Sequence, residues 1–478
     1  MTTKRPHRKT RNGCKFCKER RIKCDEGKPS CERCRQKGIL CSFLTIVPLG
    51  LPSNGTSRYA TAASSTVSPL PFVVNTYDHW IQPKVLPQPA LPELVDLTLA
   101  SSRNPELDRV LLRTYVNDTA SSLSDQKETR LAWSEAVPRI ALSHPFLADG
   151  MLAMGALHLS RLQRNSSAET YLRRATVKFD QCLPVFRNTI ETLSVSNCNP
   201  LFVFASFIVV FLFAIASNDS GAHLASLDSS RRQGEFRVGA AILNRYLQAF
   251  QALRGPLFIL SSYFDHLHGG PCSHIFSRPL WPKEPLSAAL AHAGMGASAD
   301  DARLLSLKTL WADETVEVQA TLNRTLEDLR WSFALVACIS RDPTGAVSGL
   351  SFRTEEEIAE DRDEAPAVLT DRSAVLVFPT RMIIPFIELV AAHHRPASIL
   401  LAYYTVLLDR VGDLWWSKNT GKHIALAVAL VLGRESRDWI EWPMAHLGLD
   451  EVWADEKENY GSNLRSLLQV DRGGNAHL

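Results

Sequence analysis

Apolar residues recur at intervals of three and four through most of the chain beyond residue 93, which is the spacing of a buried helix face. Alternation of apolar and polar residues between hairpin turns, the pattern of strands, is scarce there. Ser143 stands where a helix N-cap is expected, and Pro184 predicts a kink or break in a later helix. The helical spacing is clearest over residues 143–162, 167–193, 234–255 and 302–339. We therefore expect a large all-α body.

One apolar run, LFVFASFIVVFLFAIA at Leu201–Ala216, extends for sixteen residues without a charge. A membrane-spanning helix needs about 20 apolar residues, so this run is short for a span. Its aromatic and β-branched content, without basic flanks, favours a helix buried on all sides. We expect it at the centre of the body and expect no membrane span.

The segment before the helical region has a different composition. Residues 46–92 are rich in Pro, Ser, Thr, Ala and Gly, which is typical of a flexible linker. No heptad pattern occurs there, so no coiled coil is predicted, and a homodimer would have to form through the body. The predicted organisation is a head at 1–45, a linker at 46–92 and a helical regulatory and activation domain at 93–478.

Charge separates the head from the rest of the chain. The 478 residues are 45% apolar and 22% charged, an ordinary globular composition. From Met1 to Cys41, however, there are fourteen Lys and Arg and four Asp and Glu, whereas the rest of the chain has 39 basic and 46 acidic residues. A basic head on an acidic body predicts a polyanion-binding domain. The arm KRPHRKTR, Lys4–Arg11, suits nuclear import and phosphate contact, and no secretory signal is seen.

Six cysteines lie within the head, in the pattern C-x2-C-x6-C repeated twice. Structural zinc takes four ligands, so six thiolates serve two Zn²⁺ ions if two sulfurs are shared. Symmetry between the halves makes the first cysteine of each, Cys14 and Cys31, the bridging ligands. The complete predicted ligand set is Cys14, Cys17, Cys24, Cys31, Cys34 and Cys41. The alternatives are a disulfide knot, which belongs to secreted chains, and an iron–sulfur site, whose usual spacings differ.

With these six cysteines, the basic block CKERRIKCDE and the turn proline in KPSC, residues 13–43 resemble the fungal binuclear zinc cluster domain of transcription regulators. The resemblance implies that each half is a short helix followed by an extended strand. It also implies that the first helix enters the major groove of double-stranded DNA over a CGG-like triplet.

The same resemblance implies roles for the basic residues between the second and third cysteines. Arg20 and Arg21 would reach base edges or nearby phosphates, while Lys18 and Lys23 would hold phosphates. Arginine can bond guanine bidentately, and lysine suits phosphate as a point charge. Glu19 departs from the basic pattern. The alternative is a solvated basic face with nonspecific DNA affinity.

The body resembles, more loosely, the regulatory region of the sterol-uptake-control type regulators. The resemblance rests on VPRIALSHPFLADGMLAMGALHLSRLQ, on the apolar run at 201–216 and on the C-terminal stretch that ends in WIEWP. It implies a helical domain that binds a sterol and controls activation. Our hypothesis is that the core around Leu201–Ala216 binds a small apolar effector. A filled core is the alternative.

These observations predict a nuclear, sequence-specific regulator of RNA polymerase II transcription that acts through the transcription machinery. We expect control of a metabolic pathway or a specialised-metabolite gene cluster, or alternatively of sterol and lipid homeostasis. No HExxH, P-loop or nucleophile elbow occurs, so we expect no enzyme. A DNA-tethered scaffold or an enzymatic body are the competing hypotheses.

Overall fold

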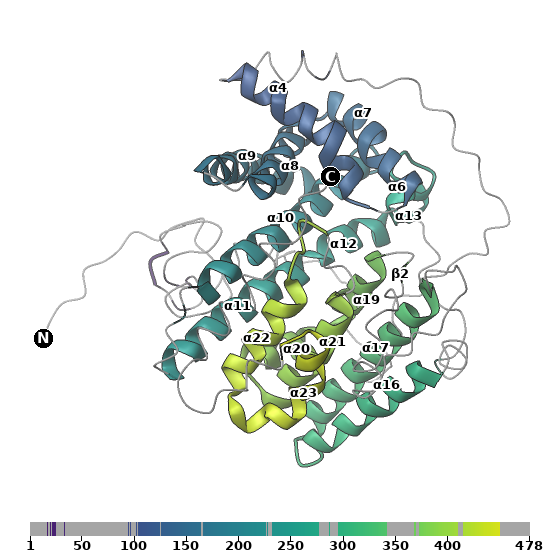
Figure 1. Cartoon of the computed structure of the whole chain (residues 1–478). Coiled ribbons are helices and arrows are strands. Elements are labelled where there is room, and N and C mark those ends of the chain that lie inside the picture. The colour runs from purple at the N-terminus through teal and green to yellow at the C-terminus, as the bar shows by residue number, and fades with distance from the viewer. Residues whose placement is uncertain are drawn as a thin grey trace, which may run out of the picture. The chain divides into compact units, whose positions relative to one another are not determined.

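Figure 1 shows the computed structural model of the chain, which divides into two compact units, Met1–Gln88 and Pro89–Leu478. The structure describes single residues or short pieces at 17, 20, 22–24, 33, 94, 96, 102, 227, 286 and 368–369, and the longer segments 104–124, 126–163, 166–225, 232–276, 295–341, 372–409 and 414–449. The predicted linker at 46–92 lies outside these residues.

The first half of the body forms one group of helices, drawn in blue at the top of Figure 1. The first turn of α4 is closed by the Asn104 side chain, which accepts a hydrogen bond from the Leu107 N–H at 3.3 Å. Two π-helical turns, η1 and η2, interrupt the early helices. The elements are α4 Pro105–Thr114, η1 Tyr115–Thr119, α5 Ala120–Ser122, α6 Lys127–Leu131, η2 Ala132–Ala136, α7 Val137–Leu142, α8 Pro145–Leu162 and α9 Ser166–Ile190.

The second half of the body follows α10 along the chain, and its helices from α16 onward are drawn in green and yellow below α10 in Figure 1. Its two strands, β1 Ser340–Arg341 and β2 Val368–Leu369, make one short antiparallel pair. Its helices are α11 Arg232–Ala252, α12 Arg254–Ser262, α13 Phe264–His268, α14 Ser273–Phe276, α16 Met295–Ser306, η3 Leu307–Trp311, α17 Val316–Ile339, η4 Arg372–Leu376, α19 Val377–Arg381, α20 Ile384–Ala391, α21 Arg395–Asp409, α22 Thr420–Leu432, η5 Arg434–Ser436 and α23 Arg437–His446. The prediction of a large helical body is confirmed.

The long helix α10, Cys198–Ala225, joins the two groups, because it contacts α7, α8 and α9 on one side and α11, α12 and α22 on the other. Among the described residues it is the one single helix long and apolar enough to cross a membrane. The helices at 372–381 and 384–391 reach the required length only when they are counted together, and the chain bends by 91° between them. Of the most apolar 18-residue window of α10, 83% is buried inside the protein. The apolar run thus packs as the core helix that its composition predicts.

Aromatic rings fill the space around the middle of α10. The Phe204 ring contacts the rings of Phe146, Phe179 and Phe186, with centroids 5.5, 5.3 and 5.1 Å away. One turn further, Phe207 stacks on Trp133 at 5.7 Å. Burying each such side chain contributes about 1.5–3 kcal/mol, so these rings are a major source of the body's stability.

Two glycines allow helices to approach closely. A methyl group built on Gly155 of α8 would collide with the backbone carbonyl of Leu111 in α4. One on Gly239 of α11 would lie 2.7 Å from the Ala427 carbonyl oxygen in α22. Both crossings therefore require a residue without a side chain.

Several local predictions need correction. Ser143 ends α7 rather than capping the next helix, whose N-cap position is His144. Of the two alternatives at Pro184, a kink or a break, the break is wrong, because α9 continues through this residue to Ile190. The adjacent histidines 393 and 394 occupy the turn between α20 and α21. There the left-handed φ of 61° at His393 closes α20 through N–H bonds to the carbonyls of residues 389 and 390.

Candidate zinc-cluster and regulatory sites

In the N-terminal unit, the structure describes two of the six predicted zinc ligands, Cys17 and Cys24. Cys17 is helical and its side chain is fully buried, and that of Cys24 is 2% exposed. The Ile22 N–H donates to the Cys17 carbonyl at 3.0 Å, which closes the helical turn just before Cys24. Two thiols are thus buried within a segment whose other residues are mostly charged, and this environment fits a pair of metal-binding thiolates.

The described cations between and beyond these cysteines face solvent. Arg20, Lys23 and Arg33 are all exposed. Buried sulfurs with exposed cations around them suit a domain that holds metal inside and presents charge to a polyanion. The remaining predicted site residues lie outside the described part of the chain: Cys14, Lys18, Arg21, Cys31, Cys34 and Cys41. Among the side chains that are described, no group of three or more metal-binding residues comes together.

Comparison with known families gives two matches. Residues 12–47 match the fungal Zn(2)-Cys(6) binuclear cluster domain, and residues 110–233 match the fungal specific transcription factor domain. A zinc cluster ahead of a helical regulatory domain defines a DNA-binding regulator of transcription, a class of proteins that are not enzymes. The chain carries both domains of the fungal Zn(2)-Cys(6) transcription factors.

Several curated proteins are similar to this chain. A Zn(2)-C6 fungal-type transcription factor of Gibberella zeae is 24% identical over 98% of this chain and 93% of its own length. Sterol uptake control protein 2 of Saccharomyces cerevisiae is 50% identical over 40 residues, which is 8% of this chain and 4% of that protein. The aspercryptin biosynthesis cluster-specific transcription regulator of Emericella nidulans is 38% identical over 58 residues, 12% of this chain and 10% of its own.

The zinc expectation is confirmed at the level of the domain, because the Zn(2)-Cys(6) binuclear cluster domain binds two zinc ions. When bound, the metal supplies a structural crosslink that replaces a hydrophobic core in so small a domain. The doubled cysteine spacing by itself predicted this two-zinc domain. The described burial of Cys17 and Cys24 agrees with it.

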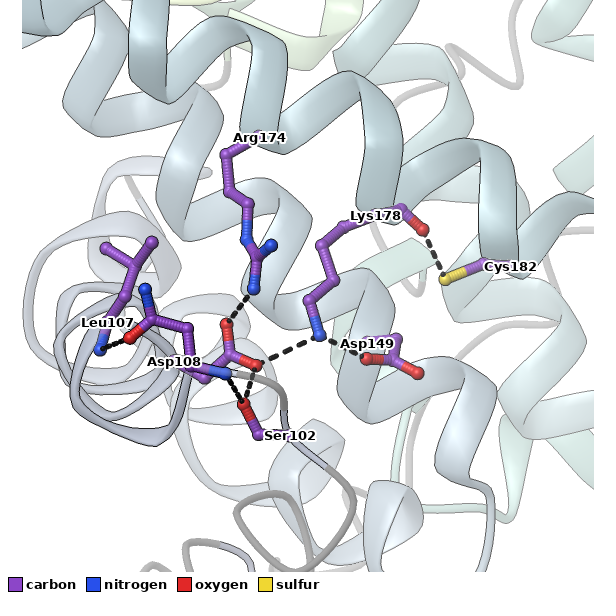
Figure 2. Close-up of polar contacts among 8 residues, drawn as sticks. Ser102, Leu107, Asp108, Asp149, Arg174, Lys178 and Cys182 are labelled. Carbon is purple, nitrogen blue, oxygen red and sulfur yellow. Dashed lines mark hydrogen bonds and ion pairs between the residues drawn. The ribbon is translucent and has the colours of Figure 1, made fainter.

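The helical body contains a buried ionic network that sequence reasoning missed (Figure 2). The Asp108 carboxylate of α4 is bound by Arg174 at 3.0 Å and by Lys178 at 3.1 Å, both from α9. Ser102 donates to it at 2.8 Å, and Lys178 also reaches Asp149 of α8 at 2.9 Å. The network ties α4, α8 and α9 together. A hint existed in the sequence, since Asp108 falls on the same face of its helix as the buried Leu111 and Leu112.

Opposing effects set the pKa of Asp108. Burial is the largest effect and raises the pKa of its carboxyl, but the hydrogen bonds from Ser102, Arg174 and Lys178 together outweigh it. The net pKa is lowered from the ordinary value. Asp108 is therefore ionised at neutral pH, and the network holds its charge two residues before the segment that matches the fungal specific transcription factor domain.

Proposed function

We propose that this protein is a nuclear, sequence-specific regulator of RNA polymerase II transcription whose zinc cluster reads a CGG-like triplet in double-stranded DNA. The observation that carries the proposal is the burial of Cys17 and Cys24 on either side of the exposed Arg20 and Lys23. Metal ligation at both ends of this short segment would hold its cations in a fixed arrangement, as base reading requires.

Within this proposal the six cysteines share the two zinc ions. Cys14 and Cys31 bridge, Cys17 and Cys24 complete one tetrahedron, and Cys34 and Cys41 complete the other. Arg20 and Arg21 contact base edges or nearby phosphates, and Lys18 and Lys23 neutralise phosphates. The head comprises residues 1–45, the linker 46–92, and the regulatory and activation domain 93–478.

Selection of binding sites from random DNA by the full-length, zinc-loaded protein tests the reading function. We expect an enriched triplet of the CGG type, and the spacing of any repeat reports whether two copies bind together through the body. Recovered sequences without a shared triplet would instead indicate a nonspecific basic surface and would contradict the proposal.

The helical body, in this proposal, controls transcriptional activity and contacts the transcription machinery. A small apolar effector that binds around Leu201–Ala216 is the proposed input, although binding would have to displace the aromatic rings that pack there. Mass spectrometry of lipids that copurify with the protein tests this input. Absence of both a copurifying apolar molecule and a thermal shift with added sterols would exclude it.

For the regulated process, we propose a metabolic pathway or a specialised-metabolite gene cluster. The relative in Emericella nidulans, a regulator specific to the aspercryptin biosynthesis cluster, supports this choice. Sterol or lipid homeostasis is the second candidate, supported by the name of the Saccharomyces cerevisiae relative. Transcript profiling after deletion of the gene separates the two. Loss of expression in one contiguous set of biosynthetic genes supports the first, and changes in sterol genes alone would contradict it.

A further inference from the structure

The turn that leads into α22, residues 414–419, binds helices that come much earlier in the chain. The indole N–H of Trp415 donates to the Ser122 hydroxyl at the end of α5, 293 residues away in sequence. The Ser217 hydroxyl of α10 donates to the Lys418 carbonyl at 2.8 Å, across 201 residues. Both partners fall within the segment that matches the fungal specific transcription factor domain. The turn thus connects that segment to the C-terminal helices.

Two adjacent indoles make the aromatic contacts of this turn. Trp415 stacks on His158 of α8 with ring centroids 4.6 Å apart, and Trp416 meets Phe213 of α10 edge-on at 5.6 Å. The Trp416 side chain is buried. With the hydrogen bonds to α5 and α10, these six residues contact three helices at once. Because so short a segment makes all of these contacts, we expect it to bind the three helices, or to leave them, as one piece.

Three features of the bound turn oppose these contacts. Nε1 of Trp416 and Oγ of Ser417 are buried, and neither has a hydrogen-bond partner among the described residues. Asn419 has a φ of 59°, in the left-handed region where a side chain is unfavourable. Each buried polar group without a partner costs free energy of the same order as the burial of an aromatic ring gains. The bound turn is therefore held by a small net free energy.

The helices around the turn are held more firmly. Every residue of α22 from His423 to Val431 is buried, and α22 packs against α10, α11 and α21. The contacts of α10 with α7, α8 and α9, and those of α14 with α6 and η2, also join the first helical group to the rest of the body. None of these contacts involves residues 414–419. The turn can therefore open while α10 and α22 stay folded.

We propose that residues 414–419 are a latch, which opens and closes as a unit while the helices on both sides stay folded. When the latch is closed, it ties α5, α8 and α10 to the start of α22. When it is open, the packing of α10 and α14 against the first helical group remains. Opening brings Nε1 of Trp416 and the Ser417 hydroxyl into water, which removes the cost of burying them unpaired. The latch is independent of the DNA-reading function proposed above.

Hydrogen exchange of the full-length, zinc-loaded protein, followed by mass spectrometry at several low urea concentrations, tests the latch. Two amides report its closure, because the Ser417 N–H bonds to the Leu414 carbonyl and the Thr420 N–H to the Ser417 carbonyl, each at 3.0 Å. We expect these amides to exchange at least about 100-fold faster than residues 424–431 of α22, at a rate that urea does not change. Exchange of residues 424–431 should accelerate with urea, because it requires the exposure of buried surface.

Three serine variants shift the latch in different directions. Ser217→Ala removes the hydrogen bond to the Lys418 carbonyl and should speed exchange of the latch amides by about fivefold or more. Ser417→Ala removes an unpaired buried hydroxyl and should slow their exchange by about the same factor. The matched control is Ser206→Ala, whose hydroxyl lies on the same helix as Ser217 but bonds the Phe202 carbonyl of that helix. It should leave the latch unchanged. Rates are compared after correction for the intrinsic exchange of each sequence.

Three results would overturn the proposal. Equal exchange rates and equal urea dependence in the latch and in residues 424–431 would mean that the turn opens only when the body unfolds. Faster exchange in Ser417→Ala would mean that this hydroxyl is hydrogen-bonded in the folded protein and that its burial does not favour opening. The same effect of Ser217→Ala and Ser206→Ala on the latch amides would mean that the bond from α10 does not hold the turn closed.

Discussion

The imidazole of His158 stacks on the indole of Trp415, with ring centroids 4.6 Å apart and ring planes 22° from parallel. The indole N–H of Trp415 also donates to the Ser122 hydroxyl at 2.8 Å, and Nδ1 of His158 lies 3.1 Å from the Thr119 hydroxyl. These contacts join the turn before α22 to α5 and α8. The C-terminal part of the body is thereby fastened to the segment that matches the fungal specific transcription factor domain.

The stack predicts an acid sensitivity of the body. Burial lowers the pKa of His158 from 6.5 to about 4. Between these two pH values the unfolded chain binds a proton at this residue and the folded chain does not. The contribution of neutral His158 to the free energy of unfolding is therefore fully present above about pH 6.5. It is lost as the pH falls toward 4, by about 3 kcal/mol for the whole shift. Urea unfolding of His158→Gln at pH 7.5, 6 and 5 should give a flatter profile than the wild type, and identical profiles would contradict the assignment.

Zinc removal should affect the head and leave the helical body folded. A strong chelator is expected to abolish DNA binding, because in the proposed site zinc ligation holds the cations of the head in place. Far-ultraviolet circular dichroism should remain strongly helical, since the body's core contains no metal-binding group among its described residues. Readdition of zinc should restore binding at two ions per chain. Retention of sequence-specific binding after complete chelation would exclude a zinc-dependent head.

The proposed roles of the basic residues predict different mutant behaviour. Arg21→Ala should weaken binding to the selected site by about 1–3 kcal/mol and affect random DNA less, because it removes base contacts. Lys23→Ala should weaken both similarly and reduce the salt dependence by about one phosphate contact. Fluorescence anisotropy at several salt concentrations measures both quantities. If both variants lost the same affinity for the selected site and for random DNA, the proposed difference in role between Arg21 and Lys23 would be wrong.

Gly155→Ala should destabilise the body by several kcal/mol, since its new methyl group meets the Leu111 carbonyl and forces α4 away from α8. The matched control is Gly221→Ala in α10, where nothing lies within 4 Å of the added methyl group. That variant should be more stable than the wild type by up to about 1 kcal/mol, from helix propensity alone. Denaturant unfolding decides, and similar stabilities for the two variants would mean that the α4–α8 crossing is not tight.

Asp108→Asn should lower the free energy of unfolding by about 3–5 kcal/mol, because it leaves Lys178 and Arg174 beside a buried neutral group. Asp149→Asn serves as the control. Its carboxylate is 42% exposed and contacts Lys178 alone within the network, so about 1 kcal/mol or less is expected. Because the pKa of Asp108 is lowered, the wild-type advantage over Asp108→Asn should shrink as the pH falls through the acidic range. A constant difference would show that Asp108 is not ionised.

The features that could be predicted from the sequence are those that depend on the spacing of residues close together in the chain. The helical body, the core position of α10 and the presence of a zinc cluster all followed from periodicity or from the cysteine pattern. Ser143 was misassigned because a serine between two helices can end one as readily as it begins the next. The polar networks could not be predicted, since their members lie far apart along the chain: Arg174 is 66 residues from Asp108, and Trp415 is 293 residues from Ser122.

The placement of α10 has a consequence for how the regulatory body evolved and can be dissected. The match to the fungal specific transcription factor domain ends at residue 233, yet α10 packs against α11, α12 and α22, which lie almost wholly beyond that point. A fragment cut there would expose one side of this long apolar helix to water and would become a substrate for chaperones and proteases. Residues 110–233 are therefore a unit of shared ancestry rather than a unit that folds by itself.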